Sequence, residues 1–296
     1  MGAALRVSAG AVAGLPQRDR CLVMGILNVT PDSFSDGGTY LDVPRAIEQG
    51  LALAADGADI VDIGGESTRP GARPVPLDEE LSRVLPVVRE LARAGVTVGI
   101  DTMHAAVARA ALDAGAALVN DVSGGLADPL MAPTVAAAGV PYVVTHWRAP
   151  SSEMNLHAVY GDVVADVVAE LRRRVEELTA RGVDERQIVL DPGLGFAKRP
   201  AHDWTLLAHL GELRNLGFPV LVGASRKSFI GAMLGGGDAA GVPPAARDAA
   251  SAAVSALAAA GGAHCVRVHD VPASLDAVRV AAAWNAPLGR PLVVPE

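Results

Sequence analysis

Polar side chains that could bind a ligand or stabilise charge follow almost every short apolar run of this sequence. In chain order they are Asn28, Asp62 with Glu66, Asp101, Asn120 with Asp121, His146, Asp191, Ser225 to Lys227, and Arg267 with His269. Carboxylates and amides suit the N–H and C=O edge of a flat nitrogen heterocycle, whereas Arg, Lys and His suit an anion such as phosphate. The residue types therefore predict a ligand with a heterocyclic head and an anionic tail.

Two sets of residues are assigned to the two halves of that ligand. Asp101, Asn120 and Asp191 are the candidates for the heterocycle. The cations gather in strand-end positions although the net charge of the chain is -8, and they are Arg69, Arg226, Lys227, Arg267 and His269. Such a cluster predicts a phosphate or diphosphate partner.

Three strand-end residues are kept apart from these sets. Asp62 and Asp121 are interpreted as structural, because side chains alternate between the two sides of a strand and each stands beside a better candidate. His146 is left open, because a core histidine between Thr145 and Trp147 would give the same pattern.

Eight short β-branched runs, separated by Ala- and Leu-rich segments of helical spacing, must position these residues. The runs span residues 21–28, 58–65, 96–102, 117–123, 142–147, 187–193, 219–226 and 264–270. Eight βα units predict a TIM (β/α)8 barrel, which gathers the carboxyl ends of all strands into one mouth. A doubly wound open sheet is the alternative, but the first strand lacks its GxGxxG fingerprint.

The chain is expected to form one domain over residues 1–296, with residues 1–20 as an N-terminal extension, because no linker interrupts the alternation. The negative net charge and the lack of a Lys/Arg block argue against nucleic-acid and membrane-surface partners. No segment is long and apolar enough to predict a membrane span, and the signal-peptide pattern is weak, so a cytoplasmic location is expected. Cys21 and Cys265 lack metal-ligand spacing and are interpreted as small core residues.

Two polar, glycine-containing loops follow the first two strands. The first, "TPDSFSDGG", contains Phe34 and Asp36, and the second, "GGESTRPGARPVP", contains Thr68 and Arg69. Loops of this composition at a barrel mouth predict a lid that closes over the ligand.

Seven motifs, taken together, identify a family. They are "NVTPDSFSDGG", "GGESTRPGA", "IDT", "VNDVSGG", "LDPGLGFAK", "GASRKSFIG" and "RVHDV", and they run in this order from about Met24 to Val271. In this form the sequence resembles the dihydropteroate synthases, and the "SGG", "HWR" and "DPGLGFAK" forms resemble their actinobacterial branch.

The resemblance implies a reaction and a set of roles. A dihydropteroate synthase joins 6-hydroxymethyl-7,8-dihydropterin diphosphate to p-aminobenzoate, releasing diphosphate, with the assistance of Mg²⁺ in folate biosynthesis. Asn28 would hold the metal, and Asp36, Arg69 and Lys227 would carry the catalytic roles. Pterin and diphosphate would contact Thr68, Asp101, Asn120, Asp191, Lys227, Arg267 and His269. The p-aminobenzoate pocket would involve Phe34, Thr68, Pro70, Phe196, Lys227 and Ser228.

The resemblance also implies a homodimer and competition by sulfonamides at the p-aminobenzoate pocket. One departure is Thr145, where the family commonly has Met, and it concerns the packing of the pterin. Two alternatives are weighed: a pterin-dependent methyltransferase, which would not need a diphosphate cluster, and an inactive pterin-binding paralogue. Because the "STRPG" loop and the "SRKS" motif are both intact, the sequence favours the synthase.

Overall fold

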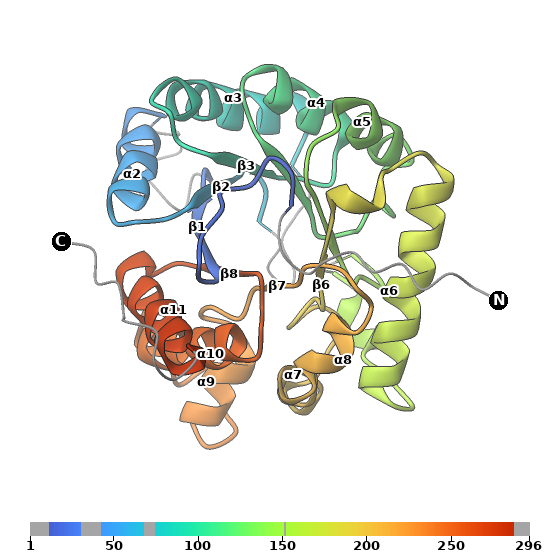
Figure 1. Ribbon diagram of the computed structural model, residues 1–296, viewed down its shortest axis with the longest axis vertical. Coiled ribbons are helices and arrows are strands. Elements are labelled where there is room, and N and C mark those ends of the chain that lie inside the picture. The colour runs from blue at the N-terminus through green and yellow to red at the C-terminus, as the bar shows by residue number, and fades with distance from the viewer. Residues whose placement is uncertain (1–11, 31–42, 68–74, 151, 287–296) are drawn as a thin grey trace.

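Eight parallel strands form one sheet that closes into a barrel (Figure 1). The computed structural model describes residues 12–30, 43–67, 75–150 and 152–286. Its strands are β1 (Leu22–Asn28), β2 (Ile60–Gly64), β3 (Val98–Asp101), β4 (Leu118–Asp121), β5 (Tyr142–Thr145), β6 (Ile188–Asp191), β7 (Leu221–Val222) and β8 (Cys265–Val268). The sheet order is β6-β5-β4-β3-β2-β1-β8-β7, and a parallel bridge between Leu190 and Val220 joins its two edges. The predicted TIM barrel is confirmed, and the open sheet is wrong.

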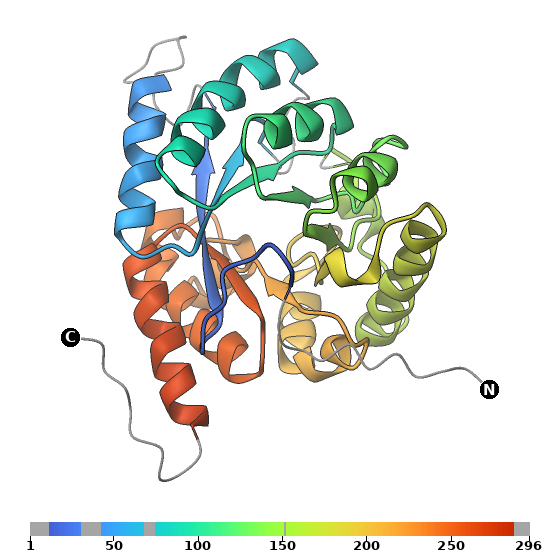
Figure 2. The same ribbon diagram turned by 45° about the horizontal axis from the view of Figure 1, so that its top comes forward.

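Helices surround the strands as an outer ring, which the tilted view in Figure 2 also shows. They are α2 (Val43–Ala55), α3 (Leu77–Arg93), α4 (Ala105–Asp113), α5 (Met131–Ala138), α6 (Val163–Ala180), α7 (Pro200–Ala208), α8 (Leu210–Arg214), α9 (Ser228–Leu234), α10 (Asp248–Ala260) and α11 (Val271–Asn285), with 3-10 turns η1 (Met154–His157), η2 (Glu185–Gln187) and η3 (Pro244–Arg247). Capping residues fix where some helices begin: Asp162 accepts the N–H groups of Val164 and Ala165. No described helix is long and apolar enough to cross a membrane.

Two apolar cores follow from the alternation of side chains along the strands. The larger lies between the strands and the helices. The smaller comprises Val12, Leu22, Met24, Ile60, Leu118, Val143, Val189, Leu221 and Cys265, which come from the early part of the strands and from the segment before β1. Because these side chains fill one end of the barrel interior, the polar residues two positions later lie toward the other end.

The segment before β1 packs onto the end of the barrel at which the strands begin. Val12 is buried in the smaller core, inside the barrel. Arg18 and Arg20 both pair with Asp59, at 2.8 and 2.6 Å, and Asp59 also accepts the N–H of Val23 at 2.9 Å. Residues 12–20 are therefore tied to the barrel, and the domain boundary at residue 20 stays a prediction.

Of the two cysteines, Cys265 is buried and Cys21 is half-buried beside the outer core. Burial raises the pKa of the Cys21 thiol to about 12 and raises that of Cys265 as well. Both thiols are therefore protonated at neutral pH, as small core residues should be.

Candidate active site

A network of four polar side chains crosses the barrel interior near the carboxyl ends of β2, β3, β4 and β8. Arg267 donates from Nε to Asp62 Oδ2 at 2.6 Å and from an Nη atom to Asp101 Oδ2 at 2.7 Å. The Asn120 side-chain amide donates to the same Asp62 oxygen at 2.8 Å. Asp62, Asn120 and Arg267 each lie two positions after a residue of the smaller core. Because side chains alternate along a strand, these three point into the barrel, where they meet Asp101.

Asp62 lies in a different place from the one expected from the sequence. The alternation argument that set Asp62 aside is wrong, because its carboxylate lies inside the barrel and holds both Arg267 and Asn120. The sequence could have predicted this position. Ile60 belongs to the smaller core, and Asp62 is two residues later on the same side of β2. Asp121 does point away and accepts the Ser123 hydroxyl at 2.7 Å.

This network has one cation for two buried carboxylates. Burial raises the pKa of Asp101 to about 7; Arg267 opposes the rise, and nearby Asp62 adds to it. The carboxylates raise the pKa of Arg267 against the effect of its burial. The Oδ1 atom of Asp62 is buried without a hydrogen-bond partner among the described residues. The guanidinium is thus held charged and fixed in orientation.

Asp191 and Lys227 lie beside each other on the adjoining side of the mouth. Gly223 separates them: a Cβ there would lie 3.7 Å from Asp191 Oδ2 and 3.9 Å from Lys227 Nζ. The Oδ1 atom of Asp191 accepts the N–H of Gly193 at 2.7 Å. Burial raises the pKa of Asp191 and lowers that of Lys227, and each partly offsets the shift of the other. The glycine keeps space open where a ligand could meet both groups.

Phe196 lies on the loop that joins β6 to α7. Lys227 Nζ is 4.7 Å from the centre of its ring, and the same ammonium donates to the carbonyl of Leu194. Ser228, the next residue, opens α9 and is exposed. The structure therefore brings together Phe196 and Lys227, two of the residues predicted for the p-aminobenzoate pocket, and places Ser228 directly after the second.

Arg226 was predicted to bind the anion, but its side chain is bound elsewhere. Its guanidinium is bidentate on Asp248 of α10, at 2.6 and 2.8 Å, and its N–H donates to Ser251. Its backbone has φ 60°, a left-handed conformation that is unfavourable for a residue with a side chain. Arg226 therefore holds the turn that carries Lys227 instead of pointing to the mouth with the other cations.

His269, just after β8, has a defined partner in Ser225. The Ser225 hydroxyl oxygen accepts the backbone N–H of His269 at 3.2 Å and is 3.0 Å from its Nδ1. This contact fixes the orientation of the imidazole ring at the end of β8. An imidazole N–H is a group that can donate to a phosphate oxygen.

Asn28 ends β1 and is half-exposed at the mouth. Among the described residues its amide has no hydrogen-bond partner, so its oxygen is available to a hard cation such as Mg²⁺. A separate acidic cluster lies after β2 and β3, where ligand atoms of Glu66, Glu80 and His104 come within 4.8 Å of one another. Both Glu80 oxygens have partners there: one accepts the Thr102 hydroxyl at 2.7 Å, and the other lies 2.7 Å from Nδ1 of His104.

A second polar group lies behind the β6–α7 loop and joins His146, whose role was left open, to Glu170 and Lys198, which the sequence analysis did not single out. His146 is buried, with Nε2 2.9 Å from Glu170 and Nδ1 3.0 Å from the ammonium of Lys198. Burial and nearby Lys198 lower the pKa of His146 to about 4, although Glu170 opposes the shift, so the ring is neutral. Thr145 is buried in the strand position opposite Asp191. Lys198 ends the motif "LDPGLGFAK", but the motif does not reveal whether its side chain turns inward or toward solvent.

Five of the predicted site residues lie outside the described residues. They are Phe34, Asp36, Thr68, Arg69 and Pro70, all on the two loops expected to form a lid. Their roles stay predictions.

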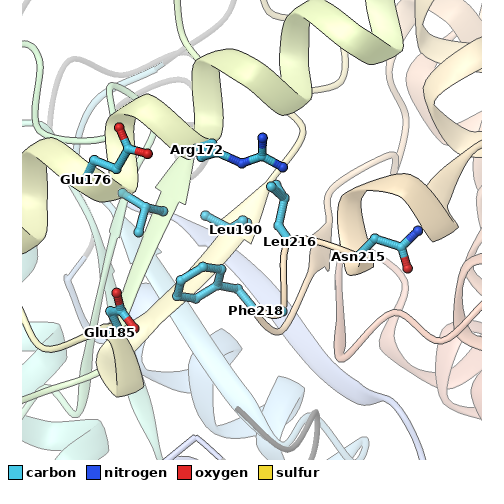
Figure 3. Close-up of a pocket in the computed structure, with 9 residues that line it drawn as sticks. Arg172, Glu176, Glu185, Leu190, Asn215, Leu216 and Phe218 are labelled. Carbon is cyan, nitrogen blue, oxygen red and sulfur yellow. The ribbon is translucent and has the colours of Figure 1, made fainter. Parts of the chain in front are cut away.

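A cavity of about 280 Å³ lies elsewhere, against the outer side of β6 (Figure 3). Its walls include Arg172 and Glu176 of α6 and the segment that ends in Phe218. Because Phe218 precedes β7 and Glu185 precedes β6, this cavity lies toward the end where the strands begin, away from the polar mouth.

Comparison with known proteins places this fold and site in a class. Residues 24–269 match the family described as pterin binding enzyme. The dihydropteroate synthase of Mycobacterium leprae (strain TN) is 58% identical over 88% of this chain and 93% of its own length. The solved Xanthomonas albilineans dihydropteroate synthase with 4-aminobenzoic acid has a TM-score of 0.83 and 46% identity over 91% of this chain and 95% of that one. A Yersinia pestis dihydropteroate synthase complexed with a sulfonamide drug has a TM-score of 0.85 and 40% identity over 93% and 98%.

The barrel with its polar mouth is therefore that of a pterin-binding enzyme. Within that class, the chain belongs to the dihydropteroate synthase family, and its likeness to the Mycobacterium leprae protein bears out the resemblance to the actinobacterial branch. It is a transferase of folate biosynthesis, as the dihydropteroate synthases are, instead of a methyltransferase. Catalysis in this family depends on a divalent metal ion.

Proposed function

We propose that the mouth of this barrel binds 6-hydroxymethyl-7,8-dihydropterin diphosphate and p-aminobenzoate and joins them into 7,8-dihydropteroate. The observation that carries the proposal is the fixed arrangement of Asp101, Asn120 and Arg267, next to Asp191 and Lys227. These groups supply acceptors and donors for the edge of a pterin, and a guanidinium plane that could stack on its face. Asp191 would accept the amino and ring N–H groups.

Charge separation is the main difficulty of the reaction. Breaking the C–O bond to diphosphate leaves positive charge on the dihydropterin and negative charge on the leaving group, so groups of both signs are needed. We assign the diphosphate to Thr68, Arg69, Arg267 and His269. Asn28 would hold Mg²⁺, which when bound supplies charge neutralisation on the diphosphate oxygens.

The second substrate would enter beside Phe196 and Lys227. Its aromatic ring can pack on Phe196, and its carboxylate can reach the start of α9 near Ser228. Phe34, Thr68 and Pro70 would complete the pocket from the two loops. The aromatic amine is a nucleophile without deprotonation, so the reaction needs no nucleophile–histidine–acid arrangement to activate it.

Asp191→Asn is the substitution that tests the pterin contact. The change turns one acceptor into a donor that faces a donor, so buried groups stay unpaired at a cost of about 1 to 3 kcal/mol. We expect calorimetry to show pterin affinity lowered at least about tenfold. Unchanged affinity would remove Asp191 from the pocket.

Sulfonamides should bind in a defined order. Because they resemble p-aminobenzoate, we expect them to bind beside Phe196, Lys227 and Ser228, and to bind more tightly once pterin and diphosphate are present and the loops have closed. Titration of a sulfonamide into the protein alone and into the protein with both ligands measures the difference. Equal affinities would contradict the ordered pocket.

A homodimer and a cytoplasmic location complete the proposal. Large apolar side chains are exposed on α10 and α11, with Leu257 at 73%, Val280 at 63% and Trp284 at 83% of full exposure. Exposed apolar side chains on two helices that pack together supply surface for contact with a second copy of the chain.

The direct test of the function is product formation. Purified protein, both substrates and Mg²⁺ should give 7,8-dihydropteroate, detected by mass spectrometry, and leaving out either substrate should abolish it. Chelation of divalent ions should also suppress the product. Absence of product with every divalent cation tried would overturn the assignment.

A further inference from the structure

The loop between β6 and α7 is bound by a side chain at each residue from 193 to 197. Lys198 donates to the carbonyls of Gly193 and Phe196, at 3.0 and 3.1 Å. The other contacts are Lys227 to the Leu194 carbonyl, the Gly195 N–H to Asp203 at 2.7 Å, and the Tyr160 hydroxyl to the Ala197 carbonyl at 3.1 Å. This density of contacts is what an irregular loop needs to keep one conformation.

The backbone of this loop would not keep its shape unaided. Gly193 and Gly195 have φ values of 67° and 76°, and Ala197 has φ 49°. The left-handed conformation is easy for glycine but unfavourable for alanine, so the surrounding contacts must hold Ala197 there. A Cβ at Gly193 would lie 2.2 Å from the carbonyl oxygen of His146, which shows how closely the loop lies against β5.

Lys198 is the central contact, because it is buried and uses all three of its donors. The residue is 7% exposed, and the third donor goes to Nδ1 of His146 at 3.0 Å. His146 can accept there because its Nε2 proton is donated to Glu170, which is itself bidentate with Arg148 at 3.0 and 2.5 Å. A hydrogen-bonded chain from Arg148 through Glu170 and His146 thus fixes the ammonium that fixes the loop.

We propose that Lys198 is a positioning residue for the p-aminobenzoate pocket. It touches neither substrate in this account. It holds the carbonyl of Phe196 on one side, while the loop that it shapes presents the Leu194 carbonyl to Lys227 on the other. The inference rests on the proposed function, which places Phe196 and Lys227 at that pocket.

The protonation state of Lys198 bears on this role. The charged groups that face it are Asp203, Asp191, Lys227 and Arg148, with His146 in direct contact. Burial lowers the pKa of Lys198 to about 7, and Asp203 and Asp191 oppose the shift. Above that pH the amine has two protons for three acceptors, and His146 cannot donate back while its proton is held by Glu170. The KM for p-aminobenzoate should therefore rise as pH rises through about 7.

Lys198→Met is the test, with Arg199→Met as the matched control that removes a charge from the next, exposed residue. We expect Lys198→Met to raise the KM for p-aminobenzoate about five- to twentyfold at saturating pterin diphosphate, because two buried carbonyls lose their donor. Pterin affinity should change less than about threefold, and the rise of KM with pH should disappear. Arg199→Met should keep the wild-type KM and the wild-type pH dependence.

Tyr160→Phe is a second, milder variant, which tests the same loop even if Lys198→Met does not fold. It removes only the hydroxyl that binds the Ala197 carbonyl and keeps the ring under Arg148. We expect a rise in KM of about two- to fivefold with thermal stability close to that of wild type. A wild-type KM for p-aminobenzoate in both folded variants would overturn the role of Lys198. Wild-type turnover in the same assay keeps this outcome distinct from failure of the proposed function.

Discussion

Replacement of Arg267 by Met should lower the free energy of unfolding by about 3 to 5 kcal/mol at neutral pH. The guanidinium pairs with Asp62 at 2.6 Å and with Asp101 at 2.7 Å, and both carboxylates are buried. Without it the two carboxylates face each other in the barrel with no cation. Denaturant unfolding monitored by circular dichroism measures the loss.

The same substitution should make stability fall more steeply as pH rises. Burial already raises the folded-state pKa of Asp101 to about 7, above its value of 3.8 in an unfolded chain, with Arg267 opposing the rise. A group with a raised folded pKa binds more protons in the folded state, so its contribution is fully present below the unfolded pKa and is lost as pH rises through the folded pKa. Removal of Arg267 raises that pKa further, so the deficit should shrink in mild acid.

Arg93→Met is the control for both measurements. Arg93 pairs with Glu90 on the exposed face of α3 and its side chain is 68% exposed, so we expect a change within about 0.5 kcal/mol. If Arg267→Met unfolds no more easily than Arg93→Met, the network is not the structural centre of the mouth.

Asp36→Ala should lower kcat and kcat/KM together by about 10² to 10³, the typical value of one preorganised electrostatic group. Asp36 lies outside the described residues, and its role comes from the reaction. If its carboxylate faces the dihydropterin cation, it interacts weakly with the neutral substrate and strongly once the C–O bond breaks. Steady-state kinetics, with pterin binding measured separately, should show nearly unchanged pterin affinity.

The competing explanation for Asp36 is a structural role in the Gly37–Gly38 turn. That role predicts a raised KM for p-aminobenzoate through poor loop closure, with kcat preserved. Asp32→Ala, four residues earlier in the same loop, controls for a general loss of loop charge. An effect on KM alone, or an equal effect of Asp32→Ala, would decide against the transition-state role.

The fold could be predicted because each strand carries its own signal. Eight β-branched runs separated by helical segments leave few arrangements other than a barrel, and each strand begins inside its predicted run. Within a strand, alternation also decides which residues share the interior. The side on which Asp62 lies follows from Ile60 two positions earlier, which points into the barrel, and not from the residues next to it in sequence.

Contacts between distant segments could not be predicted in the same way. Arg226 belongs to the "SRK" motif, yet its partner Asp248 lies on a helix that follows a loop of no recognisable period. Lys198 meets His146 across 52 residues, and nothing local distinguishes a lysine that turns inward from one that reaches solvent. Residue types therefore predicted the ligand chemistry, whereas the supporting charges required the three-dimensional structure.

A crystal structure of the protein with 6-hydroxymethyl-7,8-dihydropterin diphosphate is the most direct test of this account. We expect the pterin ring at the carboxyl end of the barrel, with its amino edge on Asp191, the Asn120 amide within hydrogen-bond distance and the Arg267 guanidinium against its face. The diphosphate should lie toward His269 and Asn28. A pterin bound outside the mouth, for example in the cavity between α6 and β6, or one without contact to Asp191, would contradict it.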